Sequence, residues 1–149
     1  MALTTTSNRV VATGDNSTVT FAFNRLLYDT THLKVYLAGV LQSTGYTVTG
    51  VPGSSTSVTF SVAPGASVQV LMLRVVPLTQ LSVYAVAGAF PAATTEKNLD
   101  LLMMGNQQFD EILGRAVTLP VSSTLTAANL PDPALAAILG IGVKIDGDG

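Results

Sequence analysis

The chain has 149 residues, of which 48% are hydrophobic and only 11% are charged, so its length predicts one domain with room for a short appendage. Soluble globular chains average about 25% charged residues, and we therefore expect part of the surface to be buried against other chains. A net charge of −2 without a basic patch argues against nucleic-acid binding, and the lack of cysteine excludes disulfides, thiolate metal sites and thiol nucleophiles.

Residues 4–90 have the pattern of short strands. Ser and Thr are abundant, apolar and polar residues alternate, and clusters of Gly, Pro and Asn interrupt the pattern at short intervals. Such a succession predicts a mainly β fold, a small antiparallel β-sandwich or barrel. The expected strands are 9–13, 18–23, 33–37, 40–42, 46–49, 57–62 and 67–76.

Three of these segments carry further detail. In strand 18–23, the alternation places Val19, Phe21 and Phe23 on one face. Ala38 and Gly39 separate two strands; a type I′ turn needs φ > 0 at both positions, so the sequence favours a type I turn with a glycine bulge. Strand 67–76 is largely apolar on both faces, which predicts a position in the middle of a sheet or under a partner.

A helix is expected over 94–117, with Thr94 or Thr95 as its N-cap. Gly105 and Gly114 each cost about 1 kcal/mol in a helix interior, so this helix needs tertiary or quaternary support. Its apolar residues follow the a and d positions of heptads, with spacings of 3-4-3-4-3. The residues of this stripe are Leu99, Leu102, Asn106, Phe109, Leu113 and Ala116.

Two interpretations of the stripe remain open at this point. A stripe of under three heptads is also typical of an amphipathic helix that docks on a sheet. Self-association is favoured by Asn106 at a central a position, where a buried Asn fixes the register of parallel helices. Self-association is also favoured by further apolar residues outside the stripe, because one sheet face would not cover them together with it. These residues are Leu101, Met103, Met104 and Ile112.

The remaining residues, 118–149, are predicted to form a linker and the start of a possible fibre shaft. Residues 121–133 are rich in Ser, Thr, Ala and Pro, and residues 134–145 are a short apolar segment whose structure the pattern leaves undecided. The apolar run 134–143 is about ten residues long, against the roughly 20 that a membrane helix needs. The first six residues lack the features of a signal peptide, so we expect no membrane insertion.

We expect no catalytic, cofactor-binding or metal site. His32 is the sole histidine, is interpreted as a surface or packing residue, and is accompanied by no nucleophile-elbow motif. Asp110 and Glu111 are adjacent and point apart on a helix, while Glu96 and Asp100 are expected to share a solvated face. The segment 146–149 resembles half of a calcium loop without its remaining ligands, and the glycines form no phosphate cradle.

The order of the elements resembles the N-terminal tail-attachment domain of tail fibre proteins from podophages of the T-seven type. The resemblance covers about residues 8–120. It is carried by strand 18–23, Tyr28 and Asp29, the hairpin 32–41, the segments 46–48, 58–60, 63–65 and 68–74, and the helical segments 96–100 and 106–116. Ala38 departs from the family, which usually has a turn-forming polar residue before Gly39, and the chain carries fewer charges than its relatives.

The resemblance implies a virion structural protein, made in the host bacterial cytoplasm and located in the phage tail. It implies a homotrimer in which the β-rich region 1–93 docks on the tail adaptor and nozzle proteins and the helix 94–117 associates as a parallel coiled coil. Residues 118–149 would lead into a shaft. The nearly charge-free stretch 35–95 is expected to face trimer mates and the tail.

Two other functions are less consistent with the residues. A receptor- or carbohydrate-binding module would need exposed aromatic side chains, yet the chain has no Trp and four Tyr. A depolymerase would need paired carboxylates and a longer chain.

Overall fold

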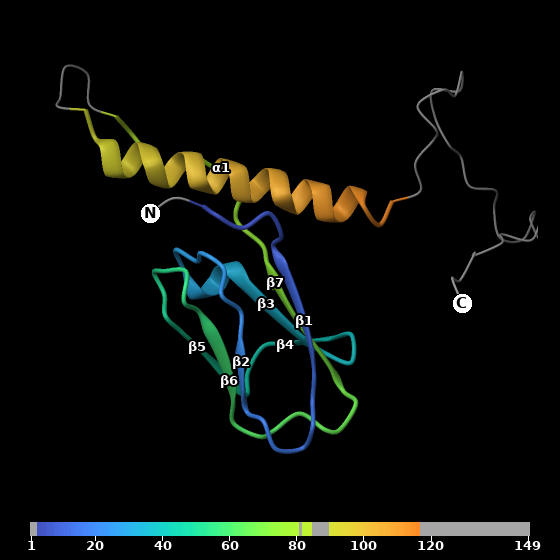
Figure 1. The fold of residues 1–149 in the computed structure, drawn as a ribbon. Coiled ribbons are helices and arrows are strands. Elements are labelled where there is room, and N and C mark those ends of the chain that lie inside the picture. The colour runs from blue at the N-terminus through green and yellow to red at the C-terminus, as the bar shows by residue number, and fades with distance from the viewer. Residues whose placement is uncertain (1–2, 81, 85–89, 117–149) are drawn as a thin grey trace, which may run out of the picture. The chain divides into compact units, whose positions relative to one another are not determined.

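The computed structural model describes residues 3–80, 82–84 and 90–116; the predicted linker and shaft segment 118–149 lies outside the described residues. All of the elements named here lie in one compact unit, Met1–Gly114. Figure 1 shows these elements. They are β1 (Arg9–Thr13), β2 (Thr20–Ala22), the 3-10 turn η1 (Thr30–His32), β3 (Leu33–Leu37), β4 (Val40–Gln42), β5 (Tyr46–Thr49), β6 (Ser57–Phe60), β7 (Gln69–Arg74) and α1 (Ala92–Leu113).

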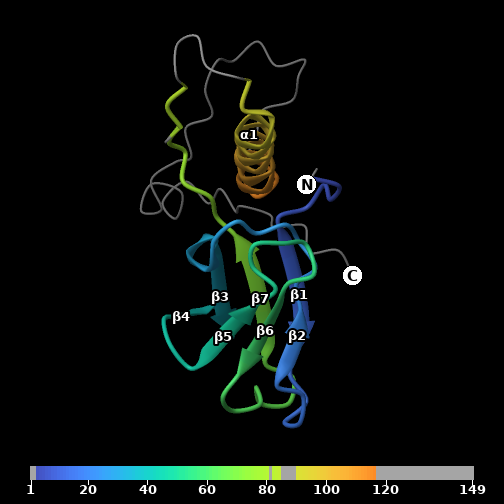
Figure 2. The same cartoon turned by 90° about the vertical axis from the view of Figure 1, so that its left-hand side faces the viewer.

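The strands form two antiparallel sheets, which confirms the mainly β fold. One sheet has the order β1-β7-β3-β4 and the other the order β2-β6-β5; both are labelled in Figure 2. We call these strands together the β domain. β7 lies between β1 and β3, so its predicted central position is confirmed. Its inward residues Val70 and Met72 are fully buried.

The core lies between the two sheets. Phe21 and Phe60, from neighbouring strands of the smaller sheet, meet edge to face with ring centroids 5.8 Å apart. Across from them, Val35, Val70 and Met72 of the larger sheet have no exposed surface. Each such side chain contributes about 1.5–3 kcal/mol when fully buried, so these rows hold the sheets together.

Three strands are shorter than predicted: β2, β6 and β7, the last of which spans Gln69–Arg74 instead of 67–76. β2 begins at Thr20, and Val19, two residues before the buried Phe21, is 38% exposed. At its other end, the N–H groups of Phe23 and Asn24 both donate to the carbonyl of Thr56, and Asn24 takes a positive φ that turns the chain away. β6 ends at Phe60, and Val62 is exposed.

The predicted turn between β3 and β4 is wrong in type. Leu37 pairs with Val40, which leaves two residues in the loop, and both take a positive φ: 48° at Ala38 and 81° at Gly39. Positive φ at both positions is the pattern of a type I′ turn, whose twist matches that of the flanking strands. The N–H of Ala38 also donates to the Gln69 carbonyl (2.9 Å), which holds Ala38 in the left-handed region.

α1 begins and ends earlier than predicted. Pro91 occupies the N-cap without a side-chain hydrogen bond, so Thr94 and Thr95 lie inside the helix and the predicted caps are wrong. Gly114 follows the last helical residue and donates to the Asp110 carbonyl (2.8 Å). Ala116, predicted as the last stripe position, therefore lies beyond the helix.

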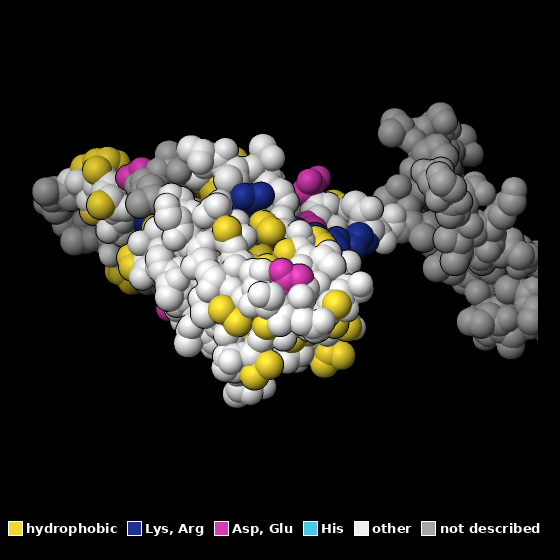
Figure 3. All heavy atoms as spheres, turned by 60° about the horizontal axis from the view of Figure 1, so that its bottom comes forward, with side chains coloured by type: hydrophobic (Ala, Val, Ile, Leu, Met, Phe, Trp, Pro, Cys, Tyr) yellow, Lys and Arg dark blue, Asp and Glu magenta, His cyan; other side chains and the backbone are white. Residues whose placement is uncertain are grey.

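The surface of the β domain is poor in charge. Arg74 is the only charged residue in the stretch 35–95, and its side chain is 1% exposed. The described part of this stretch thus presents no formal charge to solvent. Figure 3 shows the β domain mostly as uncharged polar and apolar atoms, with few charged groups.

Candidate functional site

One face of α1 is an exposed apolar stripe, and this is the candidate functional site. Leu99 is 62% exposed, Leu102 65%, Phe109 49% and Leu113 60%. Asn106, between them, is exposed as well. The structure therefore brings five of the six predicted residues onto one helix face, which we call the helix stripe. Met103 and Ile112 flank it and are about half exposed.

The opposite face of α1 packs on the β domain. Met104 is 1% exposed and forms a small core with Leu26 and Val76. Leu3, Tyr28 and Leu101 are partly buried and pack against this core. Figures 1 and 2 show α1 crossing the ends of β1 and β7 rather than lying on a sheet face. The docking interpretation therefore accounts for this face of the helix and leaves the helix stripe uncovered.

Asp100 fixes the helix near the middle of this contact. Its carboxylate accepts hydrogen bonds from the Tyr28 hydroxyl (2.6 Å) and from the Leu3 N–H (3.0 Å), and the residue is buried. The expectation that Asp100 faces solvent beside Glu96 is wrong, because the Asp100 carboxylate is hydrogen-bonded to Tyr28 and Leu3. Burial, together with the bond to Asp100, raises the pKa of Tyr28 well above its usual 10.

Arg74 joins the end of β7 to the helix. One guanidinium nitrogen donates to the Leu26 carbonyl (3.0 Å) and another donates to the side-chain oxygen of Gln107. Burial, reinforced by nearby Arg25, lowers the pKa of Arg74 to about 10. A buried cation needs such hydrogen bonds to offset its lost hydration. The next side chain along the helix, Gln108, accepts from the Val76 N–H (3.0 Å).

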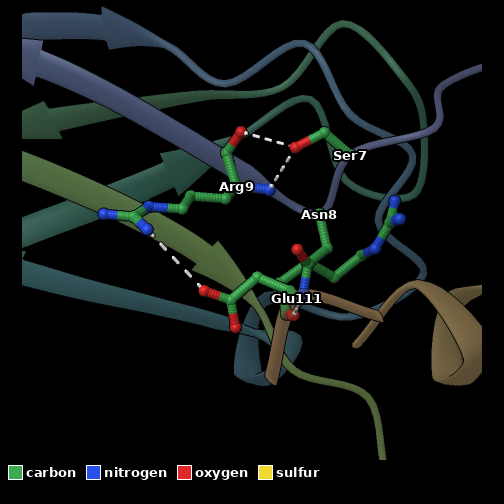
Figure 4. A network of polar contacts seen from close by, with 5 residues as sticks. Ser7, Asn8, Arg9 and Glu111 are labelled. Atoms are coloured by element: carbon green, nitrogen blue, oxygen red, sulfur yellow. Dashed lines mark hydrogen bonds and ion pairs between the residues drawn. The ribbon is translucent and has the colours of Figure 1, made fainter. Parts of the chain in front are cut away.

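The start of β1 adds a third point of attachment. Arg9 and Glu111 form an ion pair of 3.8 Å, and the Ser7 hydroxyl bonds both the N–H and the carbonyl of Arg9. Figure 4 shows these contacts. Asn8 is buried beside them and donates from its side chain to the Arg74 carbonyl (3.2 Å). Helix, β1 and β7 thus form one polar network.

The connection between β7 and α1 runs close to the helix. A Cβ atom added at Gly105 would lie 3.2 Å from a methyl carbon of Leu78, so glycine permits this close approach. Asn98 is hydrogen-bonded to both Ser82 and Tyr84. These contacts lie on the flank of α1 and leave the helix stripe exposed.

The sequence pattern missed the residues of the docked face. Asp100, Met104, Gln107 and Glu111 recur at spacings of four, three and four, so they share a helix face. A mixed polar and apolar set of this kind gives no amphipathic signal, because polar residues normally mark the solvent side of a helix. Here the polar side chains lie on the docked face and have particular partners in the fold. The spacing was the only signal available.

His32 ends the turn η1, which Asp29 caps by accepting from the Thr31 N–H (2.8 Å). Burial lowers the pKa of His32, and its Nδ1 has no hydrogen-bond partner among the described atoms. The described residues contain no cluster of three or more acidic or histidine side chains placed to hold a metal ion. No helix within them is long and apolar enough to cross a membrane.

The chain was compared with protein-family models and with curated protein sequences, and neither comparison found a match.

Proposed function

We propose that the chain is a virion structural protein, the trimeric anchor that attaches a tail fibre to the tail of a short-tailed phage. One observation carries the proposal: α1 docks on its own β domain with one face and leaves the helix stripe exposed on the other. The family resemblance supplies the biological setting, and the helix supplies the means of assembly.

The exposed stripe is costly for a solitary chain. Leu99, Leu102 and Leu113 are each more than half exposed, and full burial of such a side chain is worth about 1.5–3 kcal/mol. Three helices that pack through the stripe recover this free energy. A parallel arrangement also places the three Asn106 side chains in one layer, where they hydrogen-bond to one another and fix the register.

The β domain lies on the side of α1 opposite the helix stripe, which is compatible with a trimer. At 3.6 residues per turn, Met104 and Gln107 on the docked face point away from Leu102 and Phe109 on the helix stripe. Three helices can therefore meet along the stripe while each β domain lies outside the bundle. Met103 and Ile112 widen the apolar surface on either side, which suits a helix with two neighbours.

The trimer is tested on the full chain by sedimentation velocity and light scattering at micromolar concentration. We expect a mass three times that of the 15.4 kDa chain. The double variant Leu102→Asp, Phe109→Asp should be monomeric with its helix retained, because both positions are exposed. Val62→Asp, at an exposed apolar site just after β6, is the matched control and should stay trimeric. A monomeric wild-type chain with full helical circular dichroism would refute the trimer.

Attachment is tested separately, with tails purified from the encoding phage grown without this protein. The wild-type chain should bind these tails with saturable stoichiometry in multiples of three. A chain that forms trimers but does not bind such tails would rule out the anchor role and leave the trimer standing.

A further inference from the structure

The two sheets of the β domain present chemically different outer faces. On the smaller sheet, the outward residues of β2, β6 and β5 form two cross-strand rows of small, mostly hydroxylated side chains. These rows are Thr20, Thr59 and Thr47, and Ala22, Ser57 and Thr49. The hydroxyls of Thr20 and Thr59 are 3.0 Å apart, and those of Thr49 and Ser57 are 2.9 Å apart. This is the polar outer face that an antiparallel sheet ordinarily shows to water.

The outer face of the larger sheet is apolar instead. The register aligns Val11 with Leu71, Leu71 with Tyr36, and Tyr36 with Leu41. Directly opposed residues of paired strands point to the same side of a sheet, and the neighbouring row, which includes Met72 and Val35, points into the core. The row of Val11, Leu71, Tyr36 and Leu41 therefore crosses all four strands on the outside; we call it the outer apolar row.

The two ends of this row are exposed, and Leu71 and Tyr36 between them are partly exposed. Val11 at one end is 48% exposed and Leu41 at the other is 52% exposed. α1 crosses the ends of the strands (Figure 1) and contacts them through Arg74 and Val76. The helix stripe is on the far side of α1, so the proposed trimer does not cover the row either.

Charge indicates what kind of surface fits here. Two residues along each strand from the outer apolar row, on the same outer face of the sheet, the register aligns Arg9, Leu73 and Lys34. Glu111 of the helix engages Arg9, and Lys34 is an exposed cation at the other end of its row. The four strands contain no acidic residue. The strands of a second copy would offer Lys34 no carboxylate, whereas an apolar surface bearing a carboxylate is complementary.

We propose that the outer face of the four-stranded sheet is the surface that docks on the tail, and that its partner is a protein surface with an apolar ridge and a carboxylate opposite Lys34. This inference rests on the proposed function and specifies which face serves it. Tyr36 at the centre of the row is typical of such a contact, because aromatic residues are enriched at interface cores.

The test introduces one negative charge on each face of the β domain and measures binding to the fibre-free tails. Leu41→Asp and Val11→Asp alter the outer apolar row at its exposed ends. Thr47→Asp and Thr20→Asp are the matched controls, at exposed positions of the smaller sheet. Trimer mass and circular dichroism are required to be unchanged in all four. We expect the first pair to weaken binding at least ten-fold and the second pair to bind like wild type.

Lys34→Ala tests the charge separately. It should weaken binding several-fold in dilute salt and less in concentrated salt, because salt screens the pairing of exposed charges. The proposal would be overturned if Thr47→Asp and Thr20→Asp bound the tails more weakly than Leu41→Asp and Val11→Asp did. Equal binding by all four variants would overturn it as well. A further outcome would also overturn it: the Leu102→Asp, Phe109→Asp variant still self-associates, and adding Leu41→Asp abolishes that association. The partner of this face would then be a second copy of the chain. If wild type itself fails to bind the tails, the anchor role is what fails.

Discussion

At the scale of single residues, His32 offers a clean measurement because it is the sole histidine. Burial lowers its folded pKa below the usual 6.5. Between the folded value and 6.5, the unfolded chain binds more protons than the native one, so stability rises with pH across that window. We expect the free energy of unfolding, measured with urea, to increase from pH 5 to pH 7.

His32→Gln should flatten this slope, because no other side chain has its ordinary pKa in that range. An equal slope in the variant and the wild type would assign the pH dependence to another group.

Ala38 is a second residue whose environment predicts a measurable effect. Its φ of 48° is in the left-handed region, which costs an alanine about 1–2 kcal/mol and an asparagine less. Ala38→Asn should therefore raise the free energy of unfolding by about 1 kcal/mol. Gly39→Ala should lower the free energy of unfolding by a similar amount, because φ at this position is 81°. An added Cβ would meet no atom within 4 Å, so the backbone conformation alone causes this loss. A stabilising Gly39→Ala would contradict the type I′ assignment.

At the scale of elements, the joint between α1 and the β domain depends on Asp100. Asp100→Ala leaves the Leu3 N–H and the Tyr28 hydroxyl, both part-buried, without their acceptor; a fully buried unsatisfied group costs about 1–3 kcal/mol, and a part-buried one costs less. We expect a loss of about 2 kcal/mol in urea unfolding and faster hydrogen exchange of the α1 amides. The Leu102→Asp, Phe109→Asp background removes any effect of self-association.

Asp110→Ala is the matched control for this joint, since Asp110 is exposed on the same helix; it should change stability by no more than about 0.5 kcal/mol. Equal losses from Asp100→Ala and Asp110→Ala would mean that the carboxylate of Asp100 does not hold the helix.

The elements also show how far the sequence reaches. Short strand-like runs between turn residues located all seven described strands, and in β3, β6 and β7 buried residues recur at every second position, so the period of two survives in the sequence. It could not locate the docked face of α1, where Arg74, Asp100 and Gln107 are held by partners distant in the chain. It also missed the type I′ turn, because Ala38 opposes that turn locally and the pairing of Leu37 with Val40 imposes it.

The stripe was predicted as a set of residues but not as an exposed face. Heptad spacing selects Leu99, Leu102 and Phe109 whether a sheet or another helix covers them. Only the contacts of Met104 and Asp100 show that the β domain uses the other side. Because the two faces are opposite, the chain can dock its helix internally and still offer the helix stripe to other chains.

At the scale of the whole molecule, Asn106 provides the test of register. In the proposed trimer, three Asn106 side chains form one central layer, which costs stability relative to an apolar layer but disfavours shifted or antiparallel arrangements. Asn106→Leu should therefore raise the midpoint of thermal unfolding at a fixed protomer concentration. It should also broaden the mass distribution in sedimentation, because other oligomers and registers become accessible. Met103→Leu, beside the seam, is the control and should keep a single trimeric species. If Asn106→Leu left both stability and mass distribution unchanged, position 106 would lie outside the seam, and the helices would have to meet through another face.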